Sequence, residues 1–377
     1  MKIGFSSFVL QGGRTGIAVY IIKLLEALQR VDLSNDYRIF VNSDEAHLLP
    51  APSTHQQHCL SAAPLVKPLP NIVWHNTVLP YLMYKEELDL VHIPTLRRLP
   101  FVHKGKLVAT IHDLSTLKIS KKYGTARYLY HQHVLTRLLP MCDRLITVSH
   151  YTKQDLLDYT DIPADRIHVI HSGIDHQLYR PRRPDSCRER LREEFGIDKP
   201  FITYVSRIEH PAKNHMTLIR AFEQLKRRHP NGLQLVLAGA DWNGASVVHD
   251  YVAQSSVCDS IHFLGFVSTE TVVDLYNATE CMVFPSYLEG FGFPVLEAMA
   301  CGAPVACSNT SAMRELAEGR AVLFDPYSID ETASAIEKAL DRNFRCRAQE
   351  EGPLYASQFN WDNSAKEVLK VYQKALD

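Results

Sequence analysis

The stretch FPSYLEGFGFPVLEAMACGAP, residues 284–304, contains the change of local structure that decides the fold class. An apolar run ends at Pro285, a loop carries Gly290 and Gly292, and an apolar helical pattern begins near Pro294. Proline suits the first turn of a helix because its missing N–H would have no partner there. The stretch therefore predicts a buried strand, a glycine-containing turn and a helix, which is the repeating unit of an α/β fold.

The turn between this strand and helix has the features of a site for an anionic ligand that carries hydroxyl groups. Glycine lets a ligand approach the backbone closely, and the helix N-terminus offers N–H groups and a positive dipole end that suit a diphosphate. Glu289 lies in the loop and Glu297 lies one turn into the helix, where each carboxylate can accept hydrogen bonds from sugar hydroxyls. Taken alone, Glu297 has a simpler explanation, because a glutamate in the first turn of a helix stabilises it by complementing the helix dipole. The joint pattern favours a ligand.

Apolar runs alternate with amphipathic helical patterns along most of the chain. These runs are nearly continuous in Val, Ile, Leu and Phe, as is typical of strands buried on both faces of a parallel sheet. The order of strands and helices predicts an α/β fold with two Rossmann-like, doubly wound parallel sheets. The predicted strands cover residues 2–8, 37–42, 90–94, 106–112, 144–149 and 167–171 in the first half, and 200–206, 233–239, 261–267, 281–285, 304–308 and 321–324 in the second.

A polar, proline-rich segment, RPRRP at residues 180–184, is unlike any buried strand and is predicted to be a linker. We expect an N-terminal domain over residues 1–180 and a C-terminal domain over residues 181–361. A final amphipathic helix over 362–377 is expected to pack back on the first domain. Since open α/β sheets bind ligands beyond the carboxyl ends of their strands, the two domains are expected to face a cleft.

Composition excludes several classes of protein. The 377 residues include 41 Lys and Arg and 42 Asp and Glu, a balance that excludes a strongly basic nucleic-acid binder. Apolar runs fall short of the roughly 18 residues that a membrane span requires, and the N-terminus is typical of a strand rather than a secretory signal. The 8 cysteines are scattered without a C-x-x-C pair, which predicts reduced cysteines and no zinc site. We therefore expect a cytoplasmic protein.

The segment EGFGFPVLEAMACGAPV, which places Glu289 and Glu297 eight positions apart, resembles the E-x7-E motif of the large retaining glycosyltransferase family 4. The resemblance extends over nearly the whole chain and implies the two-domain GT-B fold. It implies that Glu289 contacts hydroxyls of the donor sugar and that Glu297 holds the ribose hydroxyls. It also implies that the backbone around Phe291, Gly292 and Phe293 faces the sugar and the diphosphate.

Two cations, Arg207 and Lys213, lie six positions apart in the loop that follows a predicted strand. They can converge on one anion if the loop folds back, and an Arg fork with a Lys point charge suits a diphosphate. From spacing alone, two solvated surface cations are the simpler interpretation. Similar residues bind the donor pyrophosphate in the family. By the same resemblance, Phe266 and Val267 would pack on the nucleobase, although an ordinary strand end fits them equally well.

In the first half, QGGRTG at residues 11–16 follows the first predicted strand and opens a helix. It does not have the G-x-G-x-x-G spacing, and no acidic residue ends the second strand, so a dinucleotide cofactor is disfavoured. The family has a similar glycine-rich loop that faces the donor phosphate and the acceptor. The resemblance therefore assigns Gly12, Gly13 and Gly16 to donor binding.

His112, in the segment TIHD at residues 110–113, ends another predicted strand. A histidine there can hydrogen-bond a sugar hydroxyl, although a satisfied structural histidine is the commoner case. The family has a His-Asp pair at this place, and its histidine reaches the transferred sugar. The resemblance therefore implies that His112, with Glu289, belongs to the catalytic centre.

The reaction implied by the resemblance is transfer of a glycosyl group from a nucleotide-diphosphate sugar with retention of configuration. The sequence has no D-x-D motif, so we expect no metal and no cofactor, with Arg207 and Lys213 stabilising the leaving diphosphate instead. Hydrolysis by paired carboxylates is a poorer interpretation, because Glu289 and Glu297 grip the donor rather than flank a glycosidic bond.

The acceptor is less readable from the sequence than the donor. The segment between Leu114 and Pro140 has no acidic residue and interleaves basic residues with tyrosines. Such a segment can rest on an anionic membrane surface or meet a lipid-linked acceptor, or it can be a solvated basic face. We expect a saccharide or lipid-linked acceptor, with peripheral contact at the inner face of the membrane as one expectation. The basic residues are Lys118, Lys121, Lys122, Arg127 and Arg137.

The resemblance indicates bacterial polysaccharide or O-antigen (lipopolysaccharide) biosynthesis. Residues 291–297 are similar to those of mannosyl-transferring members, which makes GDP-mannose the first expected donor and leaves UDP-glucose and UDP-N-acetylglucosamine open. Two alternatives remain at this point. A GT-B epimerase would turn over the donor without an acceptor, and a non-catalytic sugar-nucleotide-binding protein would never transfer the sugar.

Overall fold

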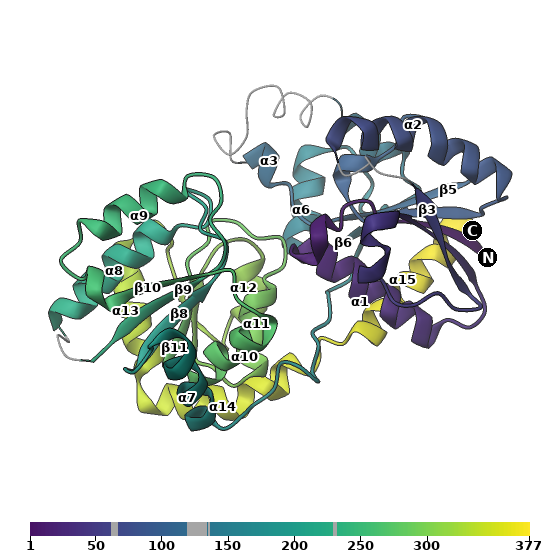
Figure 1. The fold of residues 1–377 in the computed structure, drawn as a ribbon. Coiled ribbons are helices and arrows are strands. Elements are labelled where there is room, and N and C mark those ends of the chain that lie inside the picture. Colours follow the sequence, from purple (N-terminus) through teal and green to yellow (C-terminus); the bar gives the residue numbers. More distant parts are fainter. Residues whose placement is uncertain (62–66, 119–133, 135, 229–231) are drawn as a thin grey trace. The chain divides into compact units, whose positions relative to one another are not determined.

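The computed structural model describes residues 1–61, 67–118, 134, 136–228 and 232–377. The chain forms two compact units, each described here by itself (Figure 1). Unit 1 comprises Met1–Gly173 and Phe359–Asp377, and unit 2 comprises Ile174–Gln358. Both units are built from a parallel sheet with helices, so the predicted α/β fold with two doubly wound sheets is confirmed.

The described part of unit 1 holds a seven-stranded parallel sheet with the order β3-β2-β1-β4-β5-β6-β7. Apolar residues fill its strands, except for the edge strand β3, whose sequence QQHCLS is largely polar. That polarity is why the sequence did not predict β3. The strands are β1 (Lys2–Ser6), β2 (Asp36–Asn42), β3 (Gln56–Ser61), β4 (Leu90–Ile93), β5 (Lys106–Ile111), β6 (Arg144–Thr147) and β7 (Ile167–Val169).

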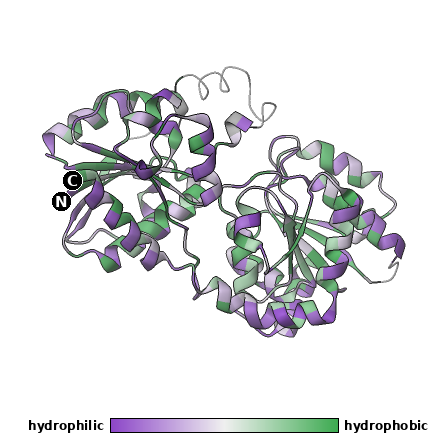
Figure 2. Ribbon diagram, turned by 180° about the vertical axis from the view of Figure 1, so that it is seen from behind, coloured by the Kyte–Doolittle hydropathy of each residue, from purple (hydrophilic) through white to green (hydrophobic). Residues whose placement is uncertain are grey.

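The helices of unit 1 cover this sheet with apolar faces. Helix α1 begins after Thr15, whose Oγ1 accepts a hydrogen bond from the Ala18 N–H, and its apolar face is buried. Figure 2 shows hydrophobic residues concentrated in the strands, whereas the helices alternate between hydrophobic and hydrophilic residues. The helices of unit 1 are α1 (Gly16–Val31), α2 (Pro68–Lys85), α3 (Ser115–Lys118), α5 (Thr136–Leu138), α6 (His150–Tyr159) and α15 (Trp361–Leu376).

Helix α15, the C-terminal end of the chain, is an integral part of unit 1. Its Asp362 pairs with Arg30 of α1 at 2.6 Å, and the Tyr372 hydroxyl lies 2.7 Å from Nδ1 of His92 on β4. Gly173 lies under the start of the helix, where a Cβ would fall 2.3 Å from the Trp361 nitrogen. The chain therefore returns to unit 1 after completing unit 2.

The described part of unit 2 holds a six-stranded parallel sheet with the order β10-β9-β8-β11-β12-β13. The strands are β8 (Phe201–Val205), β9 (Gln234–Ala238), β10 (Ile261–Gly265), β11 (Cys281–Phe284), β12 (Val305–Ser308) and β13 (Val322–Phe324). The helices are α7 (Pro184–Phe195), α8 (His215–Arg228), α9 (Ala245–Ala253), α10 (Thr269–Ala278), α11 (Phe293–Ala300), α12 (Ser311–Ala317), α13 (Ile329–Leu340) and α14 (Arg342–Ala356).

Short 3₁₀ helices connect several of these elements. They are η1 (Gln11–Gly13), η2 (Ser43–Leu48), η3 (Leu96–Arg98), η5 (Leu139–Met141), η6 (Ala164–Arg166) and η7 (Cys258–Ser260). Among the helices described, none combines the length and the apolar character needed to cross a bilayer.

The proline-rich segment predicted to be a linker lies on unit 2 instead. The Arg182 N–H donates to Asn277 Oδ1 at 2.6 Å, and the Arg182 guanidinium pairs with Glu270. Both partners belong to α10, so this segment is anchored by hydrogen bonds and an ion pair. The division between the units comes earlier, between Gly173 and Ile174.

Strand order reverses once in each sheet, between β1 and β4 in unit 1 and between β8 and β11 in unit 2. At such a switch point the loops after the two neighbouring strands leave in opposite directions, which opens a crevice at the carboxyl ends of the strands. The residues predicted to act on the donor follow β1 and β5 in unit 1 and follow β8, β10 and β11 in unit 2.

Candidate active site

The switch point of unit 2 holds an ion pair between two predicted site residues. Lys213 follows β8 and Glu289 follows β11, and the Lys213 Nζ lies 2.5 Å from Glu289 Oε1. The Ser286 hydroxyl donates to the same oxygen at 2.6 Å. The two charged side chains are 17% and 19% exposed, so a ligand can still reach them. The structure therefore joins the predicted cation and the predicted sugar-binding carboxylate in one charged group.

A buried asparagine holds the loop that carries Lys213. Asn214 Nδ2 donates to the carbonyls of Pro285 at 3.0 Å and Pro326 at 2.8 Å, which ties together the loops after β8, β11 and β13. The Tyr204 hydroxyl donates to the Lys213 carbonyl at 2.9 Å. These bonds fix the backbone at the switch point. Asn214 was not predicted from the sequence, although a polar residue directly before a helix was a usable signal.

Arg207 is held by neighbours on its own side of the sheet. Its guanidinium lies 3.1 Å from Glu209 Oε2 and 4.9 Å from the ring of Trp242, which follows β9. An arginine over an indole face is a favourable cation–π arrangement, and Trp242 is itself 51% exposed. Trp242 was missed because it is distant from Arg207 in sequence. Convergence of Arg207 and Lys213 on one anion stays a prediction.

The predicted strand–turn–helix at residues 284–304 is confirmed. Helix α11 begins at Phe293, directly after Gly292, whose φ of 109° lies in the region that favours glycine. A Cβ at Gly292 would meet only the end of the flexible Met313 side chain, so it is the positive φ that favours glycine in this turn. The rings of Phe291 and Phe293 meet edge to face at 5.1 Å. The amino end of α11 thus follows directly on the loop that carries Glu289.

Glu297, in α11, is a carboxyl group in an unusually apolar setting. Burial raises its pKa to about 7, against the opposing effect of the Tyr179 and Tyr276 hydroxyls, which favour the ionised form. At pH 7, Glu297 is therefore protonated in about half of the molecules. The two tyrosines were missed because they come from α10 and from the segment before α7.

The structure places the predicted base-contacting residues at the carboxyl end of β10. This strand ends at Gly265, where φ is 66°, after a shift in the pairing register with β9. Phe266 is 60% exposed, whereas Val267 packs against the core around Leu275. Phe266 is therefore accessible to a ligand at the binding edge of the sheet, and Val267 has a core contact as well.

In unit 1, the glycine-rich turn η1 follows β1 at the switch point. Gly12 and Gly13 have φ values of 70° and 78°, and Gly16 is the first residue of α1. The Gly12 N–H donates to Oε1 of the buried Glu45 at 2.8 Å. One of the predicted donor-binding amides is thus held by a carboxylate of its own unit.

His112 lies directly after β5, with Nε2 at 3.2 Å from the Pro94 carbonyl. A carbonyl only accepts hydrogen bonds, so Nε2 carries the hydrogen and Nδ1 is left as an acceptor. Burial lowers the pKa of His112 to about 4, although the nearby Asp113 and the Pro94 carbonyl act to raise it. The imidazole is therefore neutral at pH 7. The Tyr20 ring meets it edge-on at 4.8 Å.

A buried chain of hydrogen bonds connects four elements of unit 1. The Tyr20 hydroxyl lies 3.0 Å from Thr110 Oγ1, and His92 bridges Thr110 and Tyr372 with contacts of 2.7 Å on each ring nitrogen. Burial lowers the pKa of His92 to about 3, so this imidazole is also neutral. No local sequence motif predicts this network, because its members lie on α1, β4, β5 and α15.

Most of the basic segment predicted to meet an acceptor or a membrane lies outside the described residues. Lys121, Lys122 and Arg127 belong to that part. Lys118 is described, and it pairs with the buried Asp155 and donates to the Tyr151 hydroxyl at 2.7 Å. This lysine is therefore engaged inside unit 1.

Comparison with known proteins decides the family. The family described as Glycosyl transferases group 1 matches residues 188–371, and Glycosyltransferase Family 4 matches residues 14–178. This chain belongs to the family-4 glycosyltransferases. The O-antigen chain mannosyltransferase B of Escherichia coli is 29% identical to it over 269 residues, which cover 71% of this chain and 70% of the relative.

A second relative of this glycosyltransferase is much longer. The serotype-specific mannosyltransferase WbdA of Escherichia coli is 27% identical over 288 residues, which are 72% of this chain and 34% of the relative. The chain therefore spans about a third of WbdA.

Solved structures confirm that the glycosyltransferase has the GT-B type of fold. Sucrose-phosphate synthase from Thermosynechococcus elongatus matches with a TM-score of 0.81 at 21% identity, covering 99% of this chain and 98% of that one. Anabaena HepE in complex with UDP-glucose matches with a TM-score of 0.77 at 20% identity, covering 99% of both chains. At these identities the likeness concerns the fold.

Proposed function

We propose that this glycosyltransferase moves a sugar, with mannose as the first candidate, from a nucleotide-diphosphate donor to a saccharide or lipid-linked acceptor. We propose further that it retains the anomeric configuration and needs no metal. The observation that carries the proposal is the Lys213–Glu289 pair at the switch point of unit 2. The two mannosyltransferase relatives support mannose as the sugar, and the UDP-glucose held by a protein of the same fold supports a nucleotide-diphosphate donor.

The ion pair can bind the groups on both sides of the bond that breaks, the diphosphate and the donor sugar. A lysine ammonium has three N–H groups, so Lys213 can keep its bond to Glu289 while it donates to the diphosphate. Glu289 has further lone pairs with which it can accept from donor-sugar hydroxyls. Arg207, oriented by Trp242, supplies the second cation. In this arrangement a pair that is already desolvated holds the donor without a large rearrangement.

The proposed step breaks the bond between the anomeric carbon and the β-phosphate oxygen and forms a bond to the acceptor oxygen on the same face. The electron pair of the broken bond stays on the leaving nucleoside diphosphate, which also takes the proton of the acceptor hydroxyl. Arg207 and Lys213 stabilise the charge that develops on that phosphate. His112, neutral and with Nδ1 as an acceptor, would orient a hydroxyl of the transferred sugar without adding charge.

Glu297 would hold the ribose of the donor. Ribose hydroxyls donate hydrogen bonds, and these favour the ionised carboxylate over the protonated form that burial favours. Donor binding would therefore release a proton from Glu297 near neutral pH. The proposal thus links the donor affinity to pH through a single side chain.

The first test is a thermal-shift panel of GDP-mannose, UDP-glucose, UDP-N-acetylglucosamine and the free nucleotides. A ligand that binds only the native state raises the unfolding temperature by mass action, which ranks bases and sugars directly. We expect GDP-mannose to give the largest shift. A larger shift with a UDP-sugar would overturn mannose and leave the class of donor unchanged.

The second test follows the product and the role of a metal. With the best donor and a mannose-terminated oligosaccharide, NMR of the anomeric proton should show the donor's configuration in the product, and chelation by EDTA should leave the rate unchanged. An inverted product, or loss of activity that added Mg²⁺ or Mn²⁺ restores, would contradict the mechanism. Rapid turnover of donor without acceptor would indicate an epimerase instead.

Contact with a membrane or a lipid-linked acceptor needs its own test. Neutralising Lys121 and Lys122 should weaken co-sedimentation with anionic vesicles, because juxtamembrane basic residues contribute about 1 kcal/mol each. Vesicle binding that does not change in this variant would remove the membrane from the proposal and leave sugar transfer untouched.

A further inference from the structure

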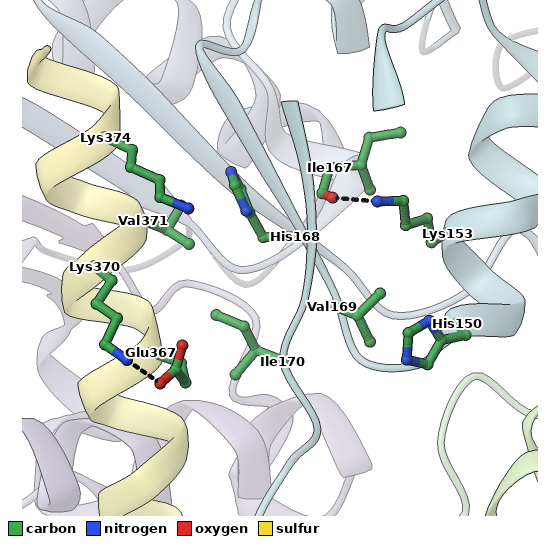
Figure 3. Close-up of a pocket in the computed structure, with 10 residues that line it drawn as sticks. All are labelled: His150, Lys153, Ile167, His168, Val169, Ile170, Glu367, Lys370, Val371 and Lys374. Carbon is green, nitrogen blue, oxygen red and sulfur yellow. Dashed lines mark hydrogen bonds and ion pairs between the residues drawn. The ribbon is translucent and has the colours of Figure 1, made fainter. Parts of the chain in front are cut away.

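A shallow pocket lies at the outer edge of the unit 1 sheet, remote in sequence from the residues proposed for transfer. It has a volume of about 320 Å³ and lies where the edge strand β7 meets α6 and α15. Figure 3 shows Lys370, Lys374 and Glu367 on α15 at one side of β7 and Lys153 on α6 at the other. We call it the β7-edge pocket; its polar lining is His150, Lys153, His168, Glu367, Lys370 and Lys374.

The lining is strongly cationic. Three lysines face one glutamate, which gives a net formal charge of +2 when the histidines are neutral. Lys370 Nζ lies 2.5 Å from Glu367 Oε1, and Lys374 has no carboxylate partner among the described residues. In a protein whose formal net charge is −1, such a local excess of positive charge calls for an anionic ligand.

Lys153 and His168 each leave a nitrogen available to a ligand. Lys153 Nζ donates to the carbonyls of Ala164 at 3.0 Å and Ile167 at 2.8 Å, which fixes the ammonium and leaves one N–H. The Nε2 atom of His168 is buried and has no hydrogen-bond partner in the described structure. Burial and the charges of Lys374, Arg144 and Lys153 lower the pKa of His168, which shows how positive this side of β7 is.

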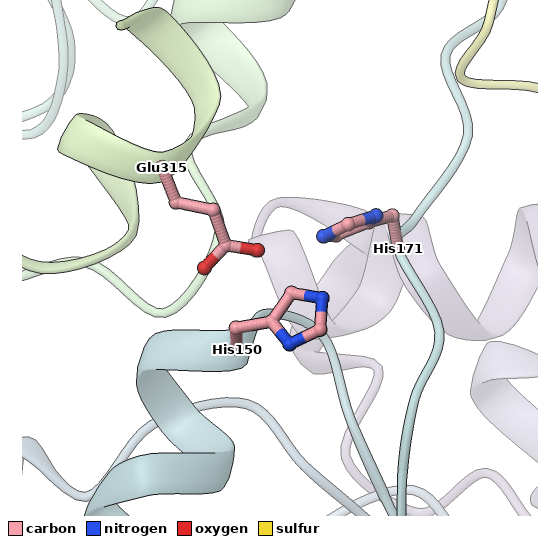
Figure 4. A group of neighbouring side chains, drawn as sticks. All are labelled: His150, His171 and Glu315. Carbon is pink, nitrogen blue, oxygen red and sulfur yellow. The ribbon is translucent and has the colours of Figure 1, made fainter.

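A second histidine lies at the rim. His150 is the first residue of α6, and its ring lies 5.9 Å from that of His171 (Figure 4). Glu315, drawn in the same figure, belongs to α12 of unit 2 and is not part of the pocket lining.

We propose that the β7-edge pocket binds the phosphate group of a small phosphate ester. Lysine donors on both sides of a strand, of which Lys153 is fixed by two carbonyls, suit an oxyanion with several acceptor oxygens. The volume falls at the lower end of the roughly 300–1,000 Å³ typical of small-molecule sites, so there is room for a phosphate and part of its ester group. The phosphate can come from a soluble sugar or glycerol phosphate or from a phospholipid headgroup.

An acidic peptide added as a strand beside β7 fits less well. The strand is three residues long, and the Lys153 ammonium already occupies its Ile167 carbonyl. Lysines of this kind block the pairing of exposed edges. The compact anion is therefore favoured over an extended one.

The first experiment titrates sn-glycerol 3-phosphate into the full chain by isothermal calorimetry. In Lys370→Ala/Lys374→Ala, loss of two charge-assisted contacts should weaken binding at least about tenfold. Glu367→Gln should strengthen binding about two- to fivefold, because it removes the one anion of the lining. These side chains are exposed on α15, so the fold should persist, and Lys338→Ala on α13 of unit 2 is the charge control.

A second double variant distinguishes binding in the β7-edge pocket from binding at the donor site. Arg207→Ala/Lys213→Ala should retain the glycerol phosphate isotherm, since both residues lie in unit 2. Loss of glycerol phosphate binding in Arg207→Ala/Lys213→Ala would overturn the β7-edge site. Unchanged binding in Lys370→Ala/Lys374→Ala would also overturn it. Binding of poly-glutamate without binding of glycerol phosphate would do the same.

The source of the phosphate is decided with vesicles. If the site takes a lipid headgroup, vesicles of phosphatidylglycerol in phosphatidylcholine should bind wild type about tenfold better than Lys370→Ala/Lys374→Ala, and glycerol phosphate should compete. If it takes a soluble ester, both proteins should bind the vesicles equally while the calorimetric difference persists. Vesicle binding that differs between the proteins without any binding of glycerol phosphate would contradict recognition of the phosphate itself.

Discussion

The carboxyl edges of the two parallel sheets carry different kinds of side chain on similar frameworks. In unit 2 the loops hold charged groups, Lys213 against Glu289 and Arg207 against Glu209. In unit 1 the corresponding edge ends in His112, a neutral imidazole that rests on a carbonyl. The same topology thus carries charged side chains in one unit and a neutral imidazole in the other, because the loops rather than the sheets differ.

The strongest way to break this comparison is to remove the cation of unit 2. Lys213→Ala should lower the rate of sugar transfer at least about a hundredfold, because it removes a donor aimed at the developing charge and leaves Glu289 unpaired. Steady-state kinetics and donor calorimetry measure the effect. Lys338→Ala, at the surface of the same unit, is the charge control.

A double variant separates charge from fold in that experiment. Lys213→Ala/Glu289→Gln should recover the thermal stability that Lys213→Ala loses, since no unpaired carboxylate remains, and it should stay inactive. Wild-type kinetics in Lys213→Ala would contradict the proposed role of the ion pair.

The neutral site of unit 1 should respond differently. His112→Ala should lower kcat about ten- to a hundredfold, the value of one or two hydrogen bonds in the transition state, with the donor Kd within about threefold of wild type. A tenfold rise in donor Kd with unchanged kcat would place His112 in binding rather than in orientation. His47→Ala, at an exposed position of unit 1, is the matched control.

Glu297 sharpens the comparison between the two units, because burial in unit 2 keeps this carboxyl group partly protonated. Its pKa is about 7 in the native state against 4.5 for an ordinary glutamate, so the native state binds more protons than the unfolded state between these values. The contribution of Glu297 to stability should therefore fall by about 3 kcal/mol as pH rises from 4.5 to 7. Calorimetric scans of Glu297→Gln should lack this component, whereas Glu350→Gln should keep it.

The same residue predicts how donor binding depends on pH. Since ribose hydroxyls favour the ionised carboxylate, donor affinity should rise as pH passes through 7, and Glu297→Gln should bind more weakly without that dependence. A pH-independent donor Kd in wild type would show that the ribose lies elsewhere.

The smallest expected effect concerns the glycine turn of unit 1. Gly12 has a φ of 70° with open space where a Cβ would go, so Gly12→Ala should cost only the backbone strain, about 1 kcal/mol. That corresponds to a fall of about 2–4 °C in the unfolding midpoint of unit 1. A much larger loss would mean that the Gly12–Glu45 hydrogen bond also breaks.

The fold was largely accessible from the sequence because parallel strands buried on both faces leave continuous apolar runs. Each of the twelve predicted strands overlaps a strand of the described structure. The strand β3 escaped because an edge position tolerates polar residues. The predicted linker lies later in the chain than the division between the units, because proline and arginine indicate exposure. In the structure, Arg182 is bound to α10 of unit 2.

The candidate site was accessible only where its parts are adjacent in sequence. The loop with Glu289, the turn at Gly292 and the helix with Glu297 form one contiguous segment, so their pattern could be read directly. Asn214 and Trp242 were not found, because each acts through elements that only the folded sheet brings together.

The return of the chain to unit 1 has a consequence for synthesis on the ribosome. Unit 2 is one continuous stretch and can fold as soon as it emerges, whereas unit 1 lacks the hydroxyl of Tyr372 for His92 until α15 leaves the exit tunnel. The N-terminal portion of the chain, made first, is therefore completed last, and a truncated transcript that loses α15 would expose a buried imidazole without its partner.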